Sequence, residues 1–139
     1  MKVVIDSSVW IAGIGSKTGY ASQAIYECFT STDIELVISE QILEEVSSNL
    51  QKKLKFEINL AAEAVAIIKN LCDFSVSTTP AQVKAVKETS HFPDRHILAL
   101  SRKTKANYLV TFDRKHLLPL KKYGKVEIVE PKEFISKIS

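Results

Sequence analysis

Short apolar runs alternate with longer amphipathic segments along the whole chain. Runs rich in β-branched residues predict strands, and apolar residues at helical spacing predict helices. The predicted strands cover residues 2–5, 35–38, 74–76, 107–111 and 126–129, and the predicted helices cover residues 20–30, 40–54, 57–72, 79–87, 94–105, 114–121 and a last segment from Pro131. A glycine-containing loop is expected between Gly13 and Gly19. This alternation predicts an α/β fold, a three-layer α/β/α sandwich around a parallel sheet.

The segment 57–72 differs from the other helical segments because it is apolar on nearly every side. Such a helix is either deeply packed or part of a subunit interface. Homodimerisation is therefore compatible with the sequence, although core packing is the more common fate of an apolar helix.

Length and composition fit one domain spanning residues 1–139. The chain is 45% apolar and 25% charged, with no linker or low-complexity segment. It has no apolar run of the roughly 20 residues that a membrane helix needs, and no signal-peptide pattern. We therefore expect a cytoplasmic protein with no membrane contact. Cys28 and Cys72 lie on apolar positions of helical patterns and form no CxxC motif, so free thiols are expected.

Positive charge is concentrated in the second half of the chain. Between Arg95 and Lys125 there are nine basic residues and one acidic residue, Asp113. This segment has a net charge of +8, so the rest of the chain carries about −5 of the total of +3. Solvated helix faces explain any single lysine, but the asymmetry as a whole favours a polyanionic substrate such as nucleic acid.

Four acidic residues lie where a strand ends or a helix starts. Asp6 follows the strand 2–5, Asp113 follows the strand 107–111, Glu45 lies in the first turns of the helix from residue 40, and Asp94 begins a helix after Pro93. Because parallel strands place their carboxyl ends at one edge of a sheet, these carboxylates are expected to cluster. Such a cluster needs protons or a cation, and Mg²⁺ or Mn²⁺ suits oxygen ligands. Helix capping is the alternative role for Asp6, Asp94 and Asp113.

The residues around these acids resemble the PIN domain family. The motifs are Asp6-Ser7-Ser8-Val9-Trp10-Ile11, Ser39 to Glu45, Pro93 to Leu100 and Ala106 to Asp113. They span nearly the whole chain in the family's order and are similar to the VapC-like toxin components of toxin–antitoxin systems. The resemblance implies a mostly parallel five-stranded sheet, a metal-dependent endoribonuclease activity, a homodimer and an antitoxin protein partner.

The resemblance also implies roles for individual residues. Asp6, Glu45, Asp94 and Asp113 match the catalytic, metal-binding acids. Helical periodicity does not separate Glu44 from Glu45, but the family's spacing of six residues after Ser39 selects Glu45. Ser8 and Thr111 match polar positions beside the acids, where each hydroxyl can orient a carboxylate or the substrate.

Two positions depart from the family pattern. His91 stands where relatives often have an acid three residues before Asp94, and Lys115, followed by His116, stands where many have a further acid. Because a fifth carboxylate is missing, we expect a second metal ion to be bound less readily. His116 could contact phosphate or donate a proton, and Arg95 and Arg114 could reach the substrate phosphate or pair with the neighbouring acids.

These residues predict metal-assisted hydrolysis of RNA, in which a bound divalent ion activates water. By resemblance the products carry a 5′-phosphate and a 3′-hydroxyl. Two other functions stay open, a non-catalytic PIN-like module that binds RNA or acts as a scaffold, and a metal-dependent nuclease acting on DNA. The chain contains no nucleotide-binding GxxxxGK[ST] or GxGxxG motif.

Overall fold

The computed structural model describes residues 1–89 and 91–139, which form a mostly parallel sheet covered by helices. The strands, in the order in which they lie in the sheet, are β3 (Phe74–Ser75), β2 (Glu35–Ile38), β1 (Lys2–Ile5), β4 (Tyr108–Val110), β6 (Val126–Val129) and β5 (Lys122–Tyr123). All neighbouring strands are parallel except β5, which is antiparallel to β6. The predicted fold class is confirmed, with six strands instead of five in the described part of the chain.

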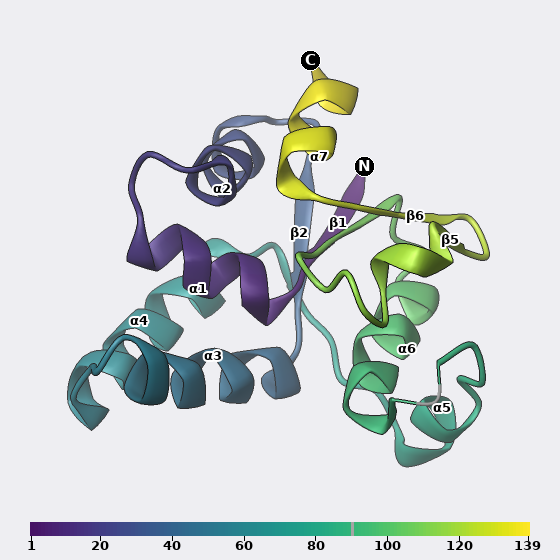
Figure 1. The fold of residues 1–139 in the computed structure, drawn as a ribbon, viewed down its shortest axis with the longest axis horizontal. Helices are drawn as coiled ribbons and strands as arrows, with labels where there is room; N and C mark the ends of the chain where they lie inside the picture. Colours follow the sequence, from purple (N-terminus) through teal and green to yellow (C-terminus); the bar gives the residue numbers. More distant parts are fainter. Residues whose placement is uncertain (90) are drawn as a thin grey trace.

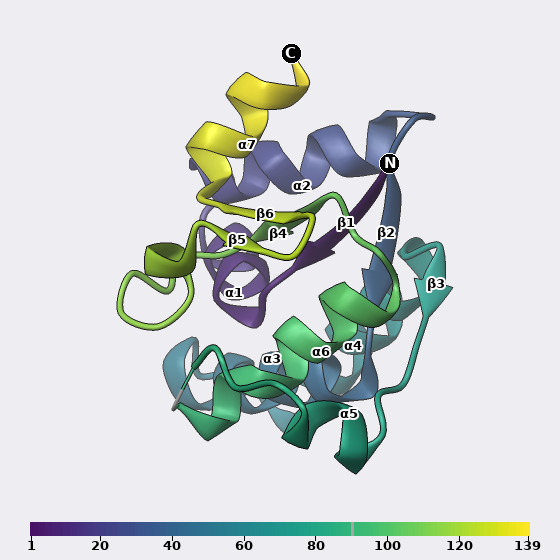
Figure 2. The ribbon, with the colours of Figure 1, turned by 90° about the vertical axis from the view of Figure 1, so that its right-hand side faces the viewer.

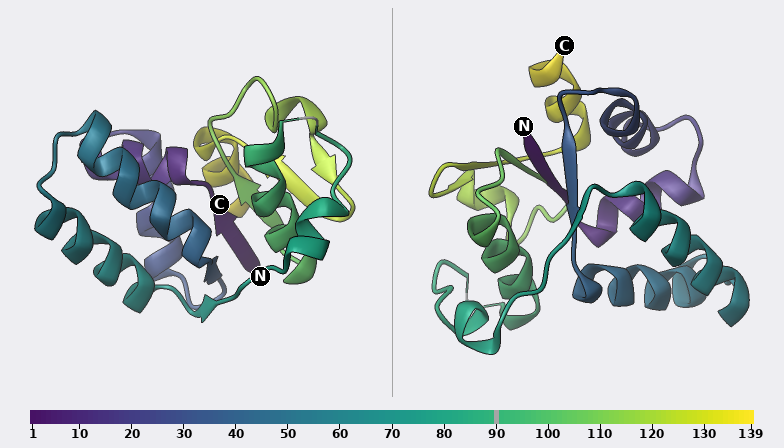
Figure 3. Two further views of the ribbon diagram at one scale, coloured as in Figure 1. Left: turned by 90° about the horizontal axis from the view of Figure 1, so that it is seen from below. Right: turned by 180° about the vertical axis from the view of Figure 1, so that it is seen from behind.

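Helices lie on both sides of this sheet, as the sandwich prediction requires. They are α1 (Ser7–Gly15), α2 (Tyr20–Thr30), α3 (Glu40–Lys53), α4 (Ile58–Leu71), α5 (Pro80–Lys84), α6 (Arg95–Lys103) and α7 (Pro131–Ile138). Helices α1, α3 and α4 lie on one side of β1 and β2, and α5 and α6 lie on the other (Figures 1 and 3). Helix α7 packs along α2 near the chain termini (Figure 2).

The central strands are buried on both faces, which explains their continuous apolar sequences. Val3, Val4 and Ile5 of β1 have no exposed surface, and β2 and β4 flank β1 directly. The register aligns Val4 with Val37 on one side and with Leu109 on the other. The residues that follow these three strands therefore emerge next to one another.

The first glycine-containing segment is helical, which corrects the prediction of a loop from Gly13. Helix α1 begins after Asp6 and continues through Gly13 to Gly15. A Cβ atom on Gly13 would lie 2.6 Å from Cδ1 of Ile25 in α2. Gly13 therefore allows α1 and α2 to pack closely, and this packing outweighs the low helix propensity of glycine.

The predicted helix 114–121 is also wrong. Residues 114–117 form turns, and a single 3₁₀ turn follows at Leu118–Leu120 before β5 begins. Pro119 lacks the N–H that a longer helix would use. Helix α5 ends at Lys84, earlier than the predicted 87, and a 3₁₀ turn at Phe92–Asp94 precedes α6.

The apolar helix α4 lies at the surface and is not deeply packed. Only Ala61 and Ile68 of this helix are buried, while Ile58 is 72% exposed and Ile67 is 58% exposed. Of the two roles that the sequence allowed, the structure excludes the deeply packed one. An interface role stays a prediction.

Both cysteines are free thiols, as predicted. Burial raises the pKa of Cys28 and of Cys72 to about 12, so both stay protonated near neutral pH. In the described parts of the chain, the helices are too short or too polar to cross a lipid bilayer.

Candidate active site

Three neighbouring strands deliver the predicted site residues to one edge of the sheet. Asp6 directly follows β1, the chain after β4 supplies Thr111 and Asp113, and Ser39 after β2 caps the helix that carries Glu45. Asp94 lies in the 3₁₀ turn just before α6. This edge is the carboxyl end of the parallel strands, where open α/β sheets bind their ligands.

The Asp6 carboxylate is held by neighbours from two strands. Its Oδ1 accepts a hydrogen bond from the Ser7 backbone N–H at 2.8 Å, as an N-cap of α1. Its Oδ2 accepts hydrogen bonds from the Ser8 hydroxyl at 3.0 Å and from the Thr111 hydroxyl at 2.7 Å. Burial raises the pKa of Asp6, and the negative charge of Glu45 acts in the same direction, although the hydroxyl donors oppose it. Asp6 is therefore a helix cap whose ionised form is disfavoured by its burial.

Ser8 and Thr111 also fix the loop that carries Asp113. The Ser8 hydroxyl accepts a hydrogen bond from the Phe112 N–H at 3.2 Å, and the Thr111 hydroxyl accepts one from the Asp113 N–H at 3.0 Å. Each hydroxyl thus donates to Asp6 and accepts a backbone N–H from the segment that follows β4. These two residues connect the ends of β1 and β4.

Asp94 and Asp113 form an unequal pair of acids. The pKa of Asp94 rises to about 6 because of burial and the nearby negative charges of Asp113 and Asp6. Burial acts on Asp113 too, but backbone N–H donors from His116 and Lys115, each at 3.0 Å from Oδ1, lower its pKa overall. Asp94 therefore holds a proton more readily than Asp113 when no cation is bound.

The structure distinguishes the two adjacent glutamates that helical periodicity does not separate. Glu44 is exposed, whereas Glu45 is partly buried and close enough to Asp6 to affect its pKa. Oε2 of Glu45 lies 3.2 Å from Nε2 of His96. Glu45 is thus the glutamate of this helix that faces the acid cluster, in agreement with the family's spacing.

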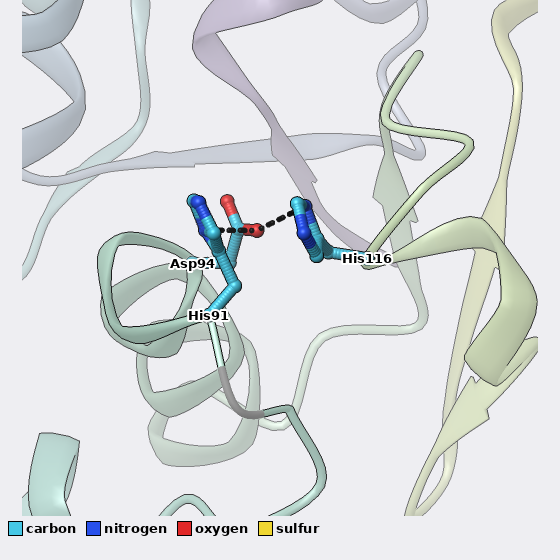
Figure 4. A group of neighbouring side chains, drawn as sticks. All are labelled: His91, Asp94 and His116. Carbon is cyan, nitrogen blue, oxygen red and sulfur yellow. Dashed lines mark ion pairs between the residues drawn. The ribbon is translucent and has the colours of Figure 1, made fainter.

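Two histidines flank Asp94 at the outer edge of the cluster (Figure 4). Oδ2 of Asp94 lies 3.0 Å from Nδ1 of His91 and 3.3 Å from Nδ1 of His116. The same His116 nitrogen lies 3.6 Å from Oδ2 of Asp113. The two imidazole rings are stacked, with centroids 4.0 Å apart and an interplanar angle of 19°.

The two candidate arginines are engaged away from the acids. Nε of Arg114 donates to Oε1 of Glu130 at 2.9 Å, and its side chain is 80% exposed. Nε of Arg95 donates to the Thr89 carbonyl at 3.2 Å, and its guanidinium lies over the Phe92 ring. The suggested pairing of these arginines with the neighbouring acids is therefore replaced by other contacts.

The basic segment does not surround the acids evenly. Arg102 and Lys103 lie in the last turn of α6, about 11–12 Å along the helix from its start at the site. Lys103 donates to the Ser77 carbonyl at 2.5 Å, and Arg102 donates to the Tyr123 hydroxyl at 3.3 Å. Lys115, next to the turn at Asp113, lies nearer the site.

Two histidines at the site were not among the predicted site residues. His91 and His96 contact Asp94 and Glu45 respectively, while His116 was predicted. A sequence signal existed for both. His91 is three residues before Asp94, and His96 is two residues after it in the first turn of α6.

The donor set fits a divalent cation. Among the described residues, His91, Asp94 and His116 each offer a ligand atom within 4.8 Å of the others, and Oδ2 of Asp113 lies 3.6 Å from Nδ1 of His116. Within the described residues, Oδ2 of Asp94 and Nδ1 of His91 are buried without a well-aligned hydrogen bond, despite their 3.0 Å separation. A cation would neutralise the acids and satisfy both atoms.

Comparisons with known proteins agree with the geometry. The sequence model of a family described as PIN domain matches residues 2–115. VapC20 of Mycobacterium tuberculosis, described as a sarcin–ricin loop cleaving toxin, is 17% identical, with a TM-score of 0.62 over 90% of this chain and 98% of that one. VapBC-1 of nontypeable Haemophilus influenzae is 11% identical, with a TM-score of 0.66 over 95% and 99%. Among curated proteins no sequence match was found.

Proposed function

Because this chain belongs to the PIN domain family, we propose that it is a divalent-metal-dependent endoribonuclease that hydrolyses RNA phosphodiester bonds. The observation that carries this proposal is the convergence of carboxylates from β1, α3, the start of α6 and the end of β4 at one edge of the sheet. The pKa values of Asp94 and Asp6 are both raised, which indicates that their negative charges lack a positive partner. A bound cation would supply this positive charge, and this supports the proposal.

In this proposal Asp6, Glu45, Asp94 and Asp113 hold Mg²⁺ or Mn²⁺. Ser8 and Thr111 position Asp6 through their hydroxyl donors at 3.0 and 2.7 Å. A bound divalent ion would polarise the phosphodiester and promote its attack by water. In this proposal the protein side chains hold the ion in place, and the RNA backbone binds next to it.

The substrate contacts are proposed from charge and position. Lys115 carries an exposed positive charge two residues after Asp113 and could hold a neighbouring phosphate. Arg95 and Arg114 would first have to leave Thr89 and Glu130 to do so. His116 lies between Asp94 and Asp113 and could relay a proton.

A toxin role is supported by the two similar structures. VapC20 is described as a cleaving toxin, and both relatives match nearly their full length. We propose an antitoxin protein as the partner of the apolar surface on α2 and α4, where a cavity of about 280 Å³ is lined by residues including Trp10, Tyr26, Phe29 and Leu71. A homodimer stays a prediction, and the molecular mass in solution, with and without a co-expressed antitoxin, tests both.

The first experiment is cleavage of a panel of single-stranded and structured RNAs with Mn²⁺, Mg²⁺ or EDTA. The wild type should cut RNA with either metal and not with EDTA. Asp6→Asn and Asp94→Asn should each lower the cleavage rate about 100-fold or more, as expected for loss of a charge that stabilises a transition state.

The adjacent glutamates provide a matched control pair. Glu45→Gln should lower cleavage, whereas Glu44→Gln should leave it unchanged because Glu44 is exposed and does not face the cluster. Equal cutting by wild type and Asp94→Asn would mean a contaminant or a different site. Cutting of DNA but not RNA would support the DNA nuclease, and RNA binding without cutting would support the non-catalytic module.

A further inference from the structure

Two imidazole nitrogens converge on a single carboxylate oxygen at the outer edge of the acid cluster. Nδ1 of His91 and Nδ1 of His116 lie 3.0 and 3.3 Å from Oδ2 of Asp94, and each of the three residues offers a ligand atom within 4.8 Å of those of the other two. His91 and Asp94 come from the segment that starts α6, and His116 comes from the turn after β4 (Figure 4).

These separations are close to those of atoms that share a metal ion. With metal–nitrogen and metal–oxygen bonds of about 2.0–2.2 Å, two ligands on a tetrahedral ion lie about 3.4 Å apart, and two adjacent ligands on an octahedral ion lie about 3.0 Å apart. The observed 3.0 and 3.3 Å fall in this range. Asp113 adds a fourth candidate donor, since its Oδ2 is 3.6 Å from Nδ1 of His116.

Hydrogen bonding alone does not account for the arrangement. Among the described residues, Nδ1 of His91 and Oδ2 of Asp94 are buried and lack a well-aligned partner. Two protonated rings stacked at 4.0 Å would repel each other. A neutral ring with its proton on Nδ1 could donate to the carboxylate, but the contact between His91 and Asp94 is not aligned for a hydrogen bond. A cation among the three atoms would satisfy Nδ1 of His91 and Oδ2 of Asp94 together.

We propose that His91, Asp94 and His116 bind a transition-metal ion, Zn²⁺, Ni²⁺ or Co²⁺, in preference to Mg²⁺. Imidazole nitrogen favours these metals, whereas Mg²⁺ prefers oxygen ligands and dehydrates reluctantly. The inference rests on the proposed function only in that Asp94 belongs to both donor sets. It adds to the acid cluster a site with two nitrogen ligands and one oxygen ligand, and this site has its own metal preference.

Binding at this end requires the two rings to turn. A metal lies near the plane of each imidazole that it binds, and the stacked rings are nearly parallel. The His91 and His116 side chains are 41% and 26% exposed, so both have room to move. We expect the stack to open when the ion binds.

The test is metal binding by the full chain without RNA. Isothermal titration with Zn²⁺, Ni²⁺, Co²⁺ or Mg²⁺ measures each affinity, and the visible absorption of bound Co²⁺ reports its ligands. Wild type should bind Zn²⁺ and Ni²⁺ at least about 100-fold more tightly than Mg²⁺, in line with the affinity order of divalent metals.

Substitutions then separate ligands from structural residues. His91→Gln and His116→Gln should each weaken Zn²⁺ and Ni²⁺ binding by about 10-fold to 100-fold, the loss typical even for an outer-shell partner of a metal site, and should affect Mg²⁺ least. His91→Asp should reduce the preference for Ni²⁺ over Mg²⁺, because it exchanges a nitrogen for an oxygen donor. Glu40→Gln, which removes the exposed ion pair with Lys69, is the control and should leave every affinity unchanged.

Equal weakening of Mg²⁺ and Zn²⁺ in the histidine variants, or no weakening in folded variants, would overturn the proposal. Circular dichroism establishes that each variant is folded. Failure of RNA cleavage with intact histidine-dependent Co²⁺ absorption would contradict the ribonuclease function alone. Cleavage that depends on Asp94, with Co²⁺ absorption independent of both histidines, would contradict this inference alone.

Discussion

At the residue scale, two hydroxyl groups fix the orientation of the Asp6 carboxylate. Ser8 and Thr111 both donate to Oδ2 of Asp6, and each accepts a backbone N–H from the segment after β4. Charge-assisted hydrogen bonds of this kind are stronger than neutral ones. They leave the Oδ1 atom of Asp6 with a single donor, the Ser7 N–H, and therefore with capacity for a cation.

Removing the Thr111 hydroxyl should cost stability as well as activity. Thr111→Val keeps the side-chain shape but leaves Oδ2 of Asp6 with the Ser8 hydroxyl as its one donor and removes the acceptor of the Asp113 N–H. We expect a decrease of about 1–3 kcal/mol in the free energy of unfolding, measured by urea denaturation, together with slower RNA cleavage. Thr104→Val removes a hydroxyl that bonds a helix carbonyl and should change stability by less than about 0.5 kcal/mol. Equal effects of the two substitutions would contradict the positioning role.

Asp94 should make the stability of the metal-free protein depend on pH. Its pKa is raised from the usual 3.8 to about 6 by burial and by Asp113 and Asp6, so the folded state binds its proton more tightly than the unfolded state does. The resulting stabilisation is complete below pH 3.8 and is lost as pH rises through 6. In EDTA, the Tm of wild type relative to Asp94→Asn should therefore fall between pH 4 and 7. A pH-independent difference would show that Asp94 titrates normally.

At the element scale, apolar residues of α4 that look equivalent in the sequence differ strongly in solvent exposure. Ile67 and Ile68 are adjacent and chemically identical, yet Ile67 is 58% exposed and Ile68 is 5% exposed. Helix α4 packs mainly on α3, so one narrow stripe is covered and the rest of its apolar surface is open. Contiguous exposed apolar residues of this kind are typical of protein interaction sites.

Truncation of Ile68 should lower stability far more than truncation of the neighbouring Ile67. Ile68→Ala should lower the free energy of unfolding by about 2–5 kcal/mol, because it leaves a cavity in the core. Ile67→Ala should change it by less than about 0.5 kcal/mol in the isolated chain. Chemical denaturation measures both values. A large loss for Ile67→Ala would mean that a second copy already covers this surface under the conditions used.

At the scale of the whole molecule, the four acids keep a negative cluster at one edge of a protein whose total charge is +3. The cluster opposes folding unless a proton or cation neutralises it, because like charges in a partly buried site repel one another. If the proposed metal site is correct, the fold couples stability to metal binding.

Metal should therefore stabilise the folded protein. A metal present at 100 times its Kd should raise the free energy of unfolding by about 2.7 kcal/mol, seen as a higher Tm in a thermal scan. Asp6→Asn combined with Asp94→Asn should abolish most of the increase. A metal-induced rise in Tm that survives in this double variant would place the stabilising ion elsewhere.

Most strands and helices, the helix start after Ser39 and the four acids could be read in the sequence, whereas the helix after Asp6 was anticipated only as an alternative capping role for this residue. They depend on local propensity and on the rule that parallel strands end at one edge. Residues 114–121 were misread because Asp113 and Pro119 turn the backbone locally. Gly13 was misread because its contact with Ile25 exists only once α1 and α2 pack.

By itself, the sequence determined the fold class, the family and the set of carboxylates, because these follow from periodicity and from motifs of adjacent residues. Only the tertiary structure brought His91 and His116 to the same oxygen of Asp94 and exposed the apolar face of α4. Each of these depends on distances between segments that are far apart in the chain, and such distances exist only after the sheet has brought its strand ends together.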